Sequence, residues 1–287
     1  MARRTQINIL VALVSIAVLA APAYAIINNK KQGEAKAEAT FRSAAPAAAG
    51  FIDQFLKLRE NSQRQLAAQY LGGPLVDIPN FDELANVFGF TSGSITDPQG
   101  NIVITYPVGV SIPGTSVHQL PAARAAAMAG GFVVSNLTTH PSAGGTSIPS
   151  IEISSSYTTW NNSIRVLTGA YSIAETPIGD FLSHLDSGGL VFLIDGQGQV
   201  ISASPDKIPT ASVVALSSLH RSLASAITRG AGGFYDTSNG NSNYFVAHDI
   251  SGTSWKLVMV ESRDLLFQGT GTSKGSFIQW LAFAGFV

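Results

Sequence analysis

The stretch Thr96–Pro107 reads TDPQGNIVITYP, and a related stretch, IDGQGQVISASP, spans Ile194–Pro205. They share Asp, Gln, Gly and Pro at four of twelve aligned positions, and Asp97 and Asp195 stand 98 positions (195 − 97) apart. In both, Asp and Gly favour a turn between two β-favouring runs, which is the pattern of a β-hairpin. Solenoid repeats are shorter, at roughly 20–50 residues. The spacing therefore predicts a duplicated domain.

The elements predicted after each hairpin follow the same order. After the first hairpin, 118–131 is predicted as a short helix, 132–139 as a strand, and 151–160 and 163–173 as two antiparallel strands. After the second, a helix over 217–230 precedes three strands over 232–237, 243–251 and 254–262. The duplicated unit is therefore a module of hairpin, helix and three strands.

Helices are predicted before and between the two modules. The region from Glu34 is helix-prone, and Pro46 and Gly50 are expected to interrupt it before the pattern resumes at 51–71 and ends at Gly72, Gly73 and Pro74. A shorter helix is expected over 81–88, and 174–189 reads as a helix connecting the modules, beginning at Pro177.

Both ends of the chain carry apolar segments. After Arg3 and Arg4, an uncharged run from Thr5 to Asn29 could cross the ~30 Å hydrocarbon core as a helix. Ala23–Ala25 also fits a signal-peptidase site, so 1–33 is a transmembrane anchor or a signal segment, and either would export the remainder. We expect 273–287 to be the truncated start of a second transmembrane helix, or alternatively a short amphipathic tail.

Composition argues against several classes of function. Charged residues make up 12% of the chain and the net charge is −1, so no basic field exists for nucleic acid. There is no cysteine, and the five histidines show no metal-site spacing. We expect no catalytic activity, cofactor or metal in these residues. A catalytic output domain in a longer parent chain is compatible with this.

Three stretches carry a resemblance to a known family. GGLVFLIDGQGQVISASPD (188–206), YFVAHDISGTSWKLVMVES (244–262) and RVLTGAYSIAETPIGDFL (165–182) resemble the double Cache sensor domains of prokaryotic receptors, over roughly Glu34 to Ser276. The resemblance implies an α+β fold between transmembrane helices. It comprises a long helix (34–80), a membrane-distal PAS-like module (81–175) and a membrane-proximal one (176–272), each an antiparallel sheet with flanking helices.

The implied function is an extracytoplasmic small-ligand sensor at the cell membrane, which passes a conformational change to a cytoplasmic kinase or cyclase. A membrane-anchored or secreted solute-binding module without signalling output is the alternative. Partners would be a small molecule, the membrane and a second copy bound through the long helix. The ligand is expected between the distal sheet and the segment from Val117 to Asn136, near Tyr106, Arg124, Tyr157, Arg165 and Tyr171.

Arg124 would favour a carboxylate, because guanidinium binds carboxylate in bidentate fashion. The Trp-Tyr pair typical of amino-acid-binding double Cache domains does not follow Arg124 here, which weakens an amino-acid assignment. The alternatives are that Arg124 is a solvated helix residue and that the tyrosines only pack in the core.

Overall fold

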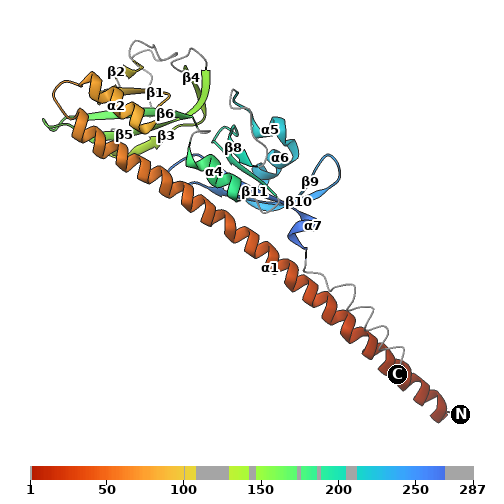
Figure 1. Cartoon of the computed structure of the whole chain (residues 1–287). Coiled ribbons are helices and arrows are strands. Elements are labelled where there is room, and N and C mark those ends of the chain that lie inside the picture. Colours follow the sequence, from red (N-terminus) through yellow and green to blue (C-terminus); the bar gives the residue numbers. More distant parts are fainter. Residues whose placement is uncertain are drawn as a thin grey trace. The chain divides into compact units, whose positions relative to one another are not determined.

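The structure is a computed structural model that describes residues 2–99, 101–107, 129–141, 147–172, 176–185, 189–204 and 212–268, with side chains from residue 31 on. Contacts group Ala44–Glu261 into one compact unit and the remaining residues into a second. The unit Ala44–Glu261 contains both β-sheets (Figure 1). Among the described residues, none of the helices has the length and apolar character that crossing a membrane requires.

Helix α1 runs unbroken from Ala2 to Leu71. The expected interruption at Pro46 and Gly50 is therefore wrong. Proline inside a helix removes a hydrogen bond and costs about 3 kcal/mol, but its neighbours here are buried small and apolar side chains: Ala45, Ala48, Ala49, Ile52 and Leu56. Packing of such a face supplies most helix stability in proteins and outweighs the local penalty. The helix ends before the Gly-Gly-Pro stretch, as predicted.

Helix α2 (Ile78–Phe88) confirms the helix predicted over 81–88. The side chain of Asp77 accepts a hydrogen bond from the amide of Asn80 at its start, and Gly89 ends it in a left-handed conformation (φ 68°) that glycine adopts without strain. The buried residues of α2 are Phe81, Leu84, Ala85 and Phe88.

The first sheet contains β1 (Ser92–Thr96), β2 (Ile102–Tyr106), β3 (Phe132–Val134), β4 (Thr138–Pro141), β5 (Ser147–Thr158) and β6 (Ile164–Ser172). Its strand order is β2-β1-β6-β5-β3, with β4 also paired to β5, and the pairs are antiparallel. The single strand expected over 132–139 is thus two strands, separated at Ser135–Leu137. The helix expected over 118–131 lies mostly outside the described residues.

The second sheet contains β7 (Leu190–Ile194), β8 (Val200–Ser204), β9 (Gly232–Asp236), β10 (Ser242–Asp249) and β11 (Lys256–Ser262), in the order β8-β7-β11-β10-β9. Helix α4 (Pro177–His184) precedes it, and α5 (Leu216–Leu219) and α6 (Arg221–Arg229) lie between β8 and β9. The short helix α7 (Arg263–Leu266) follows β11. The strand order matches that of the first sheet when β3 and β4 count as one interrupted strand.

The two hairpin turns are held by the same hydrogen bonds from backbone amides to Oδ1 of an aspartate. Asp97 Oδ1 accepts the amides of Gln99 and Asn101 at 3.0 and 2.8 Å, and Asp195 Oδ1 accepts those of Gln197 and Gln199 at 2.9 and 2.8 Å. The strand pairing also shifts register at the same point in both hairpins, just before the turn. The repeated stretch is therefore the first hairpin of two equivalent sheets.

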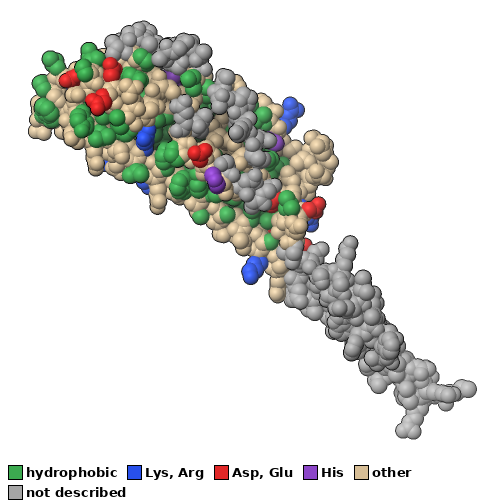
Figure 2. Space-filling model, viewed as in Figure 1, with side chains coloured by type: hydrophobic (Ala, Val, Ile, Leu, Met, Phe, Trp, Pro, Cys, Tyr) green, Lys and Arg blue, Asp and Glu red, His purple; other side chains and the backbone are tan. Residues whose placement is uncertain are grey.

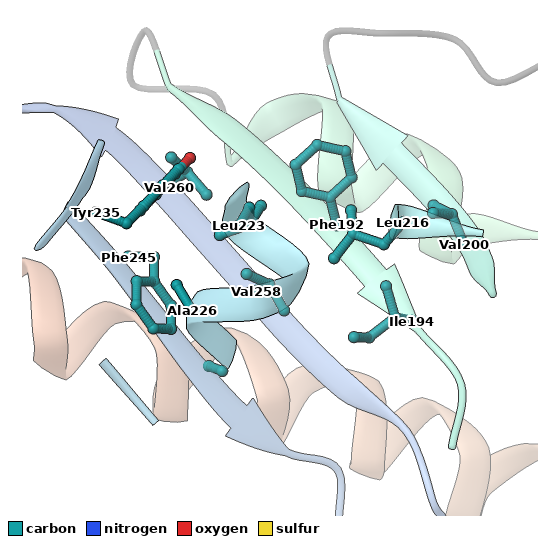
Figure 3. Packing of buried hydrophobic residues seen from close by; sticks show 11 residues of the cluster. Phe192, Ile194, Val200, Leu216, Leu223, Ala226, Tyr235, Phe245, Val258 and Val260 are labelled. Atoms are coloured by element: carbon teal, nitrogen blue, oxygen red, sulfur yellow. The ribbon is translucent and has the colours of Figure 1, made fainter. Parts of the chain in front are cut away.

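The second sheet has a continuous apolar core on one face. Figure 3 shows side chains from β7, β10 and β11 meeting those of α5 and α6. The labelled members are Phe192, Ile194, Val200, Leu216, Leu223, Ala226, Tyr235, Phe245, Val258 and Val260. The helices contribute their buried residues Leu216, Leu223 and Ala226, so this face of the second sheet is filled by the protein itself.

Candidate functional site

Four of the five predicted ligand residues lie on one face of the first sheet. Tyr157 and Arg165 are partners across β5 and β6, Tyr171 follows on the same side of β6, and Tyr106 ends β2 beside Gly93. We call this the helix face, because its side chains contact α1 and α2. Arg124 lies outside the described residues.

Arg165 binds the end of α1. Its guanidinium donates to the carbonyls of Leu71 and Gly73 at 3.1 and 2.9 Å, and to that of Pro74 at 2.8 Å. The last carbonyls of a helix have no partner within the helix, and cationic side chains commonly satisfy them. These contacts give Arg165 a role in joining α1 to β6.

The tyrosines also contact the helices. Tyr171 accepts a hydrogen bond from Gln63 Nε2 at 2.7 Å, and the Arg59 guanidinium lies 4.8 Å from its ring centre. Tyr106 donates to Asn86 Oδ1 at 2.8 Å. Tyr157 is buried, and its hydroxyl lies near the Arg165 guanidinium without a hydrogen bond of normal geometry. Burial raises the pKa of Tyr157 to about 12, although the nearby charge of Arg165 opposes the rise, and burial also raises the pKa of Tyr171.

The opposite face of the first sheet carries a run of buried hydroxyl groups, which we call the hydroxyl face. The strand registers place these residues on one side, with partners such as Ser94 and Thr168 or Thr168 and Ser154. The eight residues are Ser92, Ser94 and Thr96 on β1, Ser150, Ser154 and Ser156 on β5, and Thr168 and Ser172 on β6, and all are at most 8% exposed. Burying so many polar groups is unfavourable unless each finds a partner.

Some of these hydroxyls have partners within the sheet and some do not. Ser154 Oγ and Thr168 Oγ1 lie 2.9 Å apart, and Ser150 Oγ donates to the carbonyl of Ile148 at 3.1 Å. Thr96 Oγ1 is buried without a hydrogen-bond partner. A hydroxyl both donates and accepts, so this face can orient a polar molecule in several ways.

A histidine and a carboxylate border the hydroxyl face. Glu152 lies between Ser150 and Ser154 on β5, and His140 on β4 is only 5% exposed. His140 Nε2 lies 3.1 Å from Glu152 Oε1, without the alignment of a hydrogen bond, and Nδ1 has no partner. These two side chains add an acceptor and a titratable ring to the neutral hydroxyls.

The sequence reasoning missed the hydroxyl face, although the signal was present. Ser and Thr alternate in SGSIT over Ser92–Thr96, and they recur with the same period of two along β5. Alternate residues of a strand point to one side of a sheet. The sequence indicates that the tyrosines can bind a ligand, but it does not indicate which side of the sheet they face.

The second sheet allows a comparison within the same chain. Counting 98 positions on from Ser92, Ser94 and Thr96 gives Leu190, Phe192 and Ile194. On the neighbouring strand, Val258 pairs with Phe192 as Thr168 pairs with Ser94. The same side is thus apolar and packed in the second sheet and hydroxyl-rich in the first (Figure 3).

A small surface pocket lies elsewhere, between α1 and α2. Its volume is about 150 Å³, and its lining residues are Leu66, Tyr70, Asn80, Glu83, Leu84 and Val87. None of the four predicted ligand residues that the structure describes lines it. On the face shown in Figure 2, charged side chains lie singly or in small groups among polar and hydrophobic atoms. Within the described ranges, no group of three or more His, Asp or Glu side chains could hold a metal ion.

Comparison with solved structures identifies the fold. The ligand-binding domain of the Pseudomonas fluorescens chemoreceptor CtaA, solved with L-isoleucine, is 17% identical, covers 81% of this chain and 95% of its own, and gives a TM-score of 0.57. The ligand-binding domain of the Pseudomonas aeruginosa chemoreceptor PctC, solved with GABA, is 18% identical. It covers 78% of this chain and 98% of its own, with a TM-score of 0.55. The ligand-binding domain of Mlp24, solved with asparagine, is 11% identical. It covers 83% of this chain and 98% of its own, with a TM-score of 0.55.

The searches of family models and of curated proteins found no match. At identities this low, the similarity to solved structures concerns the fold. The chain has the fold of double Cache ligand-binding domains: a long helix followed by two antiparallel, PAS-like sheets with flanking helices. This confirms the fold predicted from the sequence.

Proposed function

We propose that this chain is the extracytoplasmic sensor region of a membrane-bound receptor, and that it binds a small polar ligand on the hydroxyl face of the first sheet. In such a receptor, ligand binding shifts a conformational equilibrium by differing in affinity for two states. The sheets would then lie outside the membrane, with 1–33 as anchor or signal segment and 273–287 leading back to the membrane.

The observation that carries this proposal is the contrast between the two sheets. Duplicated sheets with the same strand order differ on one equivalent side, where Phe192, Ile194 and Val258 replace Ser94, Thr96 and Thr168. Ligand sites combine apolar walls with a few placed polar groups. Only the first sheet offers such groups here, since the second is filled by an apolar core.

The chemistry of the site favours a small molecule with both hydrogen-bond donors and acceptors. Hydroxyls can bind either, the Glu152 carboxylate favours a donor or a cation, and Arg124, if it lies in the same site as predicted, favours a carboxylate. The chemoreceptor domains of similar fold were solved with L-isoleucine, GABA and asparagine. We therefore propose a small amino acid or a related amino carboxylate as the first candidates.

A thermal-shift screen with two matched variants tests the site. The full chain is screened with single L-amino acids, GABA and small carboxylates, and each stabilising compound is retested on Thr168→Val and Ser155→Ala. Thr168 lies on the hydroxyl face, whereas Ser155 lies on the helix face of the neighbouring strand and donates to Gln63 Oε1 at 2.9 Å. Thr168→Val should reduce the ligand-induced shift in Tm by at least half, and Ser155→Ala should leave it unchanged.

Two outcomes would contradict the proposal. If a compound stabilises both variants equally, it binds elsewhere. If Phe192→Ala in the second sheet abolishes the shift while Thr168→Val does not, the ligand belongs to the second sheet. Arg124→Ala tests the carboxylate separately, because a carboxylate whose stabilisation survives in that variant does not contact Arg124.

We also propose that the receptor is a homodimer through α1. Within Ala44–Leu71, α1 keeps some apolar side chains exposed, with Leu58 at 68% and Tyr70 at 49%. Exposed apolar surface on a helix favours association. Light scattering on the full chain should give twice the monomer mass, and Leu58→Lys should shift it to monomer.

A further inference from the structure

The break between β3 and β4 is also a contact with the second sheet. Trp255 Nε1 donates to the carbonyl of Ser135 at 3.0 Å. Asn136 Oδ1 accepts from Ser254 Oγ at 2.8 Å and from the amide of Gly196 at 3.3 Å. Ser135 therefore bonds through its carbonyl to the β10–β11 turn, and Asn136 bonds to that turn and to the β7–β8 turn.

Asp195 also takes part in this contact, and it differs from the equivalent Asp97 in the partner of its second carboxylate oxygen. Both use Oδ1 to hold their own turn. Asp97 Oδ2 accepts from Asn101 Nδ2 within the turn at 2.7 Å, whereas Asp195 Oδ2 accepts the amide of Leu137 from the first sheet at 2.9 Å. Asp195 is 2% exposed. One carboxylate thus holds a turn of the second sheet and a segment of the first.

The same segment is bonded to β5 at the border of the hydroxyl face. Ser135 donates its amide to the carbonyl of Glu152 at 2.9 Å, and its Oγ accepts the amide of Glu152 at 2.9 Å. The Glu152 side chain lies beside His140 at the border of that face. Ser135 therefore connects Glu152 to the buried indole of Trp255 by hydrogen bonds on both sides.

We propose that Ser135–Leu137, held by Asp195, Ser254 and Trp255, couples the hydroxyl face of the first sheet to the second sheet. A displacement of β5 at Glu152 moves Ser135, and the bonds to Trp255 and Asp195 pass that displacement to the hairpin that begins the second sheet. Coupling of this kind is reciprocal, so a change at Asp195 must also be felt at Glu152. This inference goes beyond the proposed binding function, and its signalling role rests on that function.

Amide hydrogen exchange of the full 287-residue chain tests the coupling without a ligand. Asp195→Asn is compared with its matched control Asp97→Asn. Both variants keep the Oδ1 acceptor that holds the turn. In Asp195→Asn, an amide NH2 takes the place of Oδ2 and faces the Leu137 N–H. The hydrogen bond from the Leu137 amide to a charged group is then lost. We expect exchange at Leu137 to accelerate about tenfold, with faster exchange at Ser135 and Glu152 as well. Asp97→Asn should leave these three amides unchanged.

A second variant keeps the test decisive if Asp195→Asn fails to fold. Asn136→Ala removes the acceptor for Gly196 and Ser254 without altering the second sheet. It should accelerate exchange at the Gly196 amide and shift the indole NMR signal of Trp255, which Trp255→Phe identifies. Wild-type exchange at Leu137, Ser135 and Glu152 in a folded Asp195→Asn protein would overturn the proposal, as would an unmoved Trp255 indole in Asn136→Ala.

The coupling and the binding proposal can fail separately. If a compound binds the hydroxyl face but leaves the Trp255 indole signal unmoved, the coupling is refuted and the binding site stands. If the variants show the coupling but no screened compound depends on Thr168, the binding proposal is refuted and the mechanical link stands.

Discussion

At the scale of single residues, two buried tyrosines on the helix face differ in one hydrogen bond. The Tyr157 hydroxyl lies near the Arg165 guanidinium but makes no hydrogen bond of normal geometry, whereas that of Tyr171 accepts from Gln63, which is itself fully buried. Removing an unpaired buried polar group is neutral or stabilising, but removing one partner of a buried pair leaves the other unsatisfied. The two Tyr→Phe substitutions should therefore have different effects on stability.

We expect Tyr157→Phe to change the free energy of unfolding by less than about 1 kcal/mol and Tyr171→Phe to lower it by about 1–3 kcal/mol. Urea unfolding of the full chain measures both. An equal loss in the two variants would show that the Tyr157 hydroxyl is satisfied in solution. The prediction from the sequence that Tyr157 binds the ligand is tested by the same variant: a ligand-induced shift in Tm that weakens in Tyr157→Phe would place the ligand on the helix face and contradict a site on the hydroxyl face.

Trp255 is fully buried, as its alternating strand context predicted, and its indole also holds Ser135. Trp255→Ala should lower the free energy of unfolding by about 3–5 kcal/mol, because a large buried aromatic is removed. Trp255→Phe keeps most of the ring volume and should cost less. A loss under about 1 kcal/mol for Trp255→Ala in urea unfolding would contradict its position in the core.

At the scale of elements, the segment between α2 and β1 packs on the first sheet at a glycine. A Cβ at Gly169 on β6 would lie 2.2 Å from the Phe90 ring, a distance that real side chains do not reach. Phe90 in turn makes a T-shaped contact with Tyr171, with ring centres 5.2 Å apart. Glycine at this position lets Phe90 lie directly on the strand.

Gly169→Ala should lower the free energy of unfolding by about 1–3 kcal/mol, because the overpacked ring must move. Gly50→Ala in α1 is the control, since a Cβ there meets nothing within 4 Å. Alanine is the better helix former, so Gly50→Ala should raise stability by up to about 1 kcal/mol. If both substitutions shift the thermal midpoint in the same direction, the contact between Phe90 and β6 is described wrongly.

Some features of these elements could be predicted from the sequence and others could not. The duplicated turns of Asp97 and Asp195 predicted two equivalent sheets, because turn chemistry is local and readable. The side of the sheet on which Tyr157 and Arg165 lie was not readable, because an error of one residue in register exchanges the two faces of a strand. The contact of Asp195 with Leu137 joins residues distant in sequence, and no local pattern reports it.

At the scale of the whole chain, two copies of one sheet have diverged on one equivalent side. In the second sheet that side is filled by Phe192, Val258 and the residues of α6, and in the first sheet it carries hydroxyls. A packed core gives stability, whereas buried hydroxyls cost stability unless they are hydrogen-bonded. We infer that the second sheet serves as support and the first as the binding module.

Amide NMR of the isotope-labelled full chain tests most directly whether the first sheet binds the ligand and the second supports it. The protein is titrated with the stabilising compound from the screen. If there is none, a mixture of L-amino acids and GABA is used. If the first sheet is the binding module, the largest shifts should fall on β1, β5 and β6, at residues such as Ser94, Ser154 and Thr168, with smaller shifts at Asp195 and Trp255. Largest shifts on β7 and β11, or no response of the first sheet at millimolar concentrations, would contradict it.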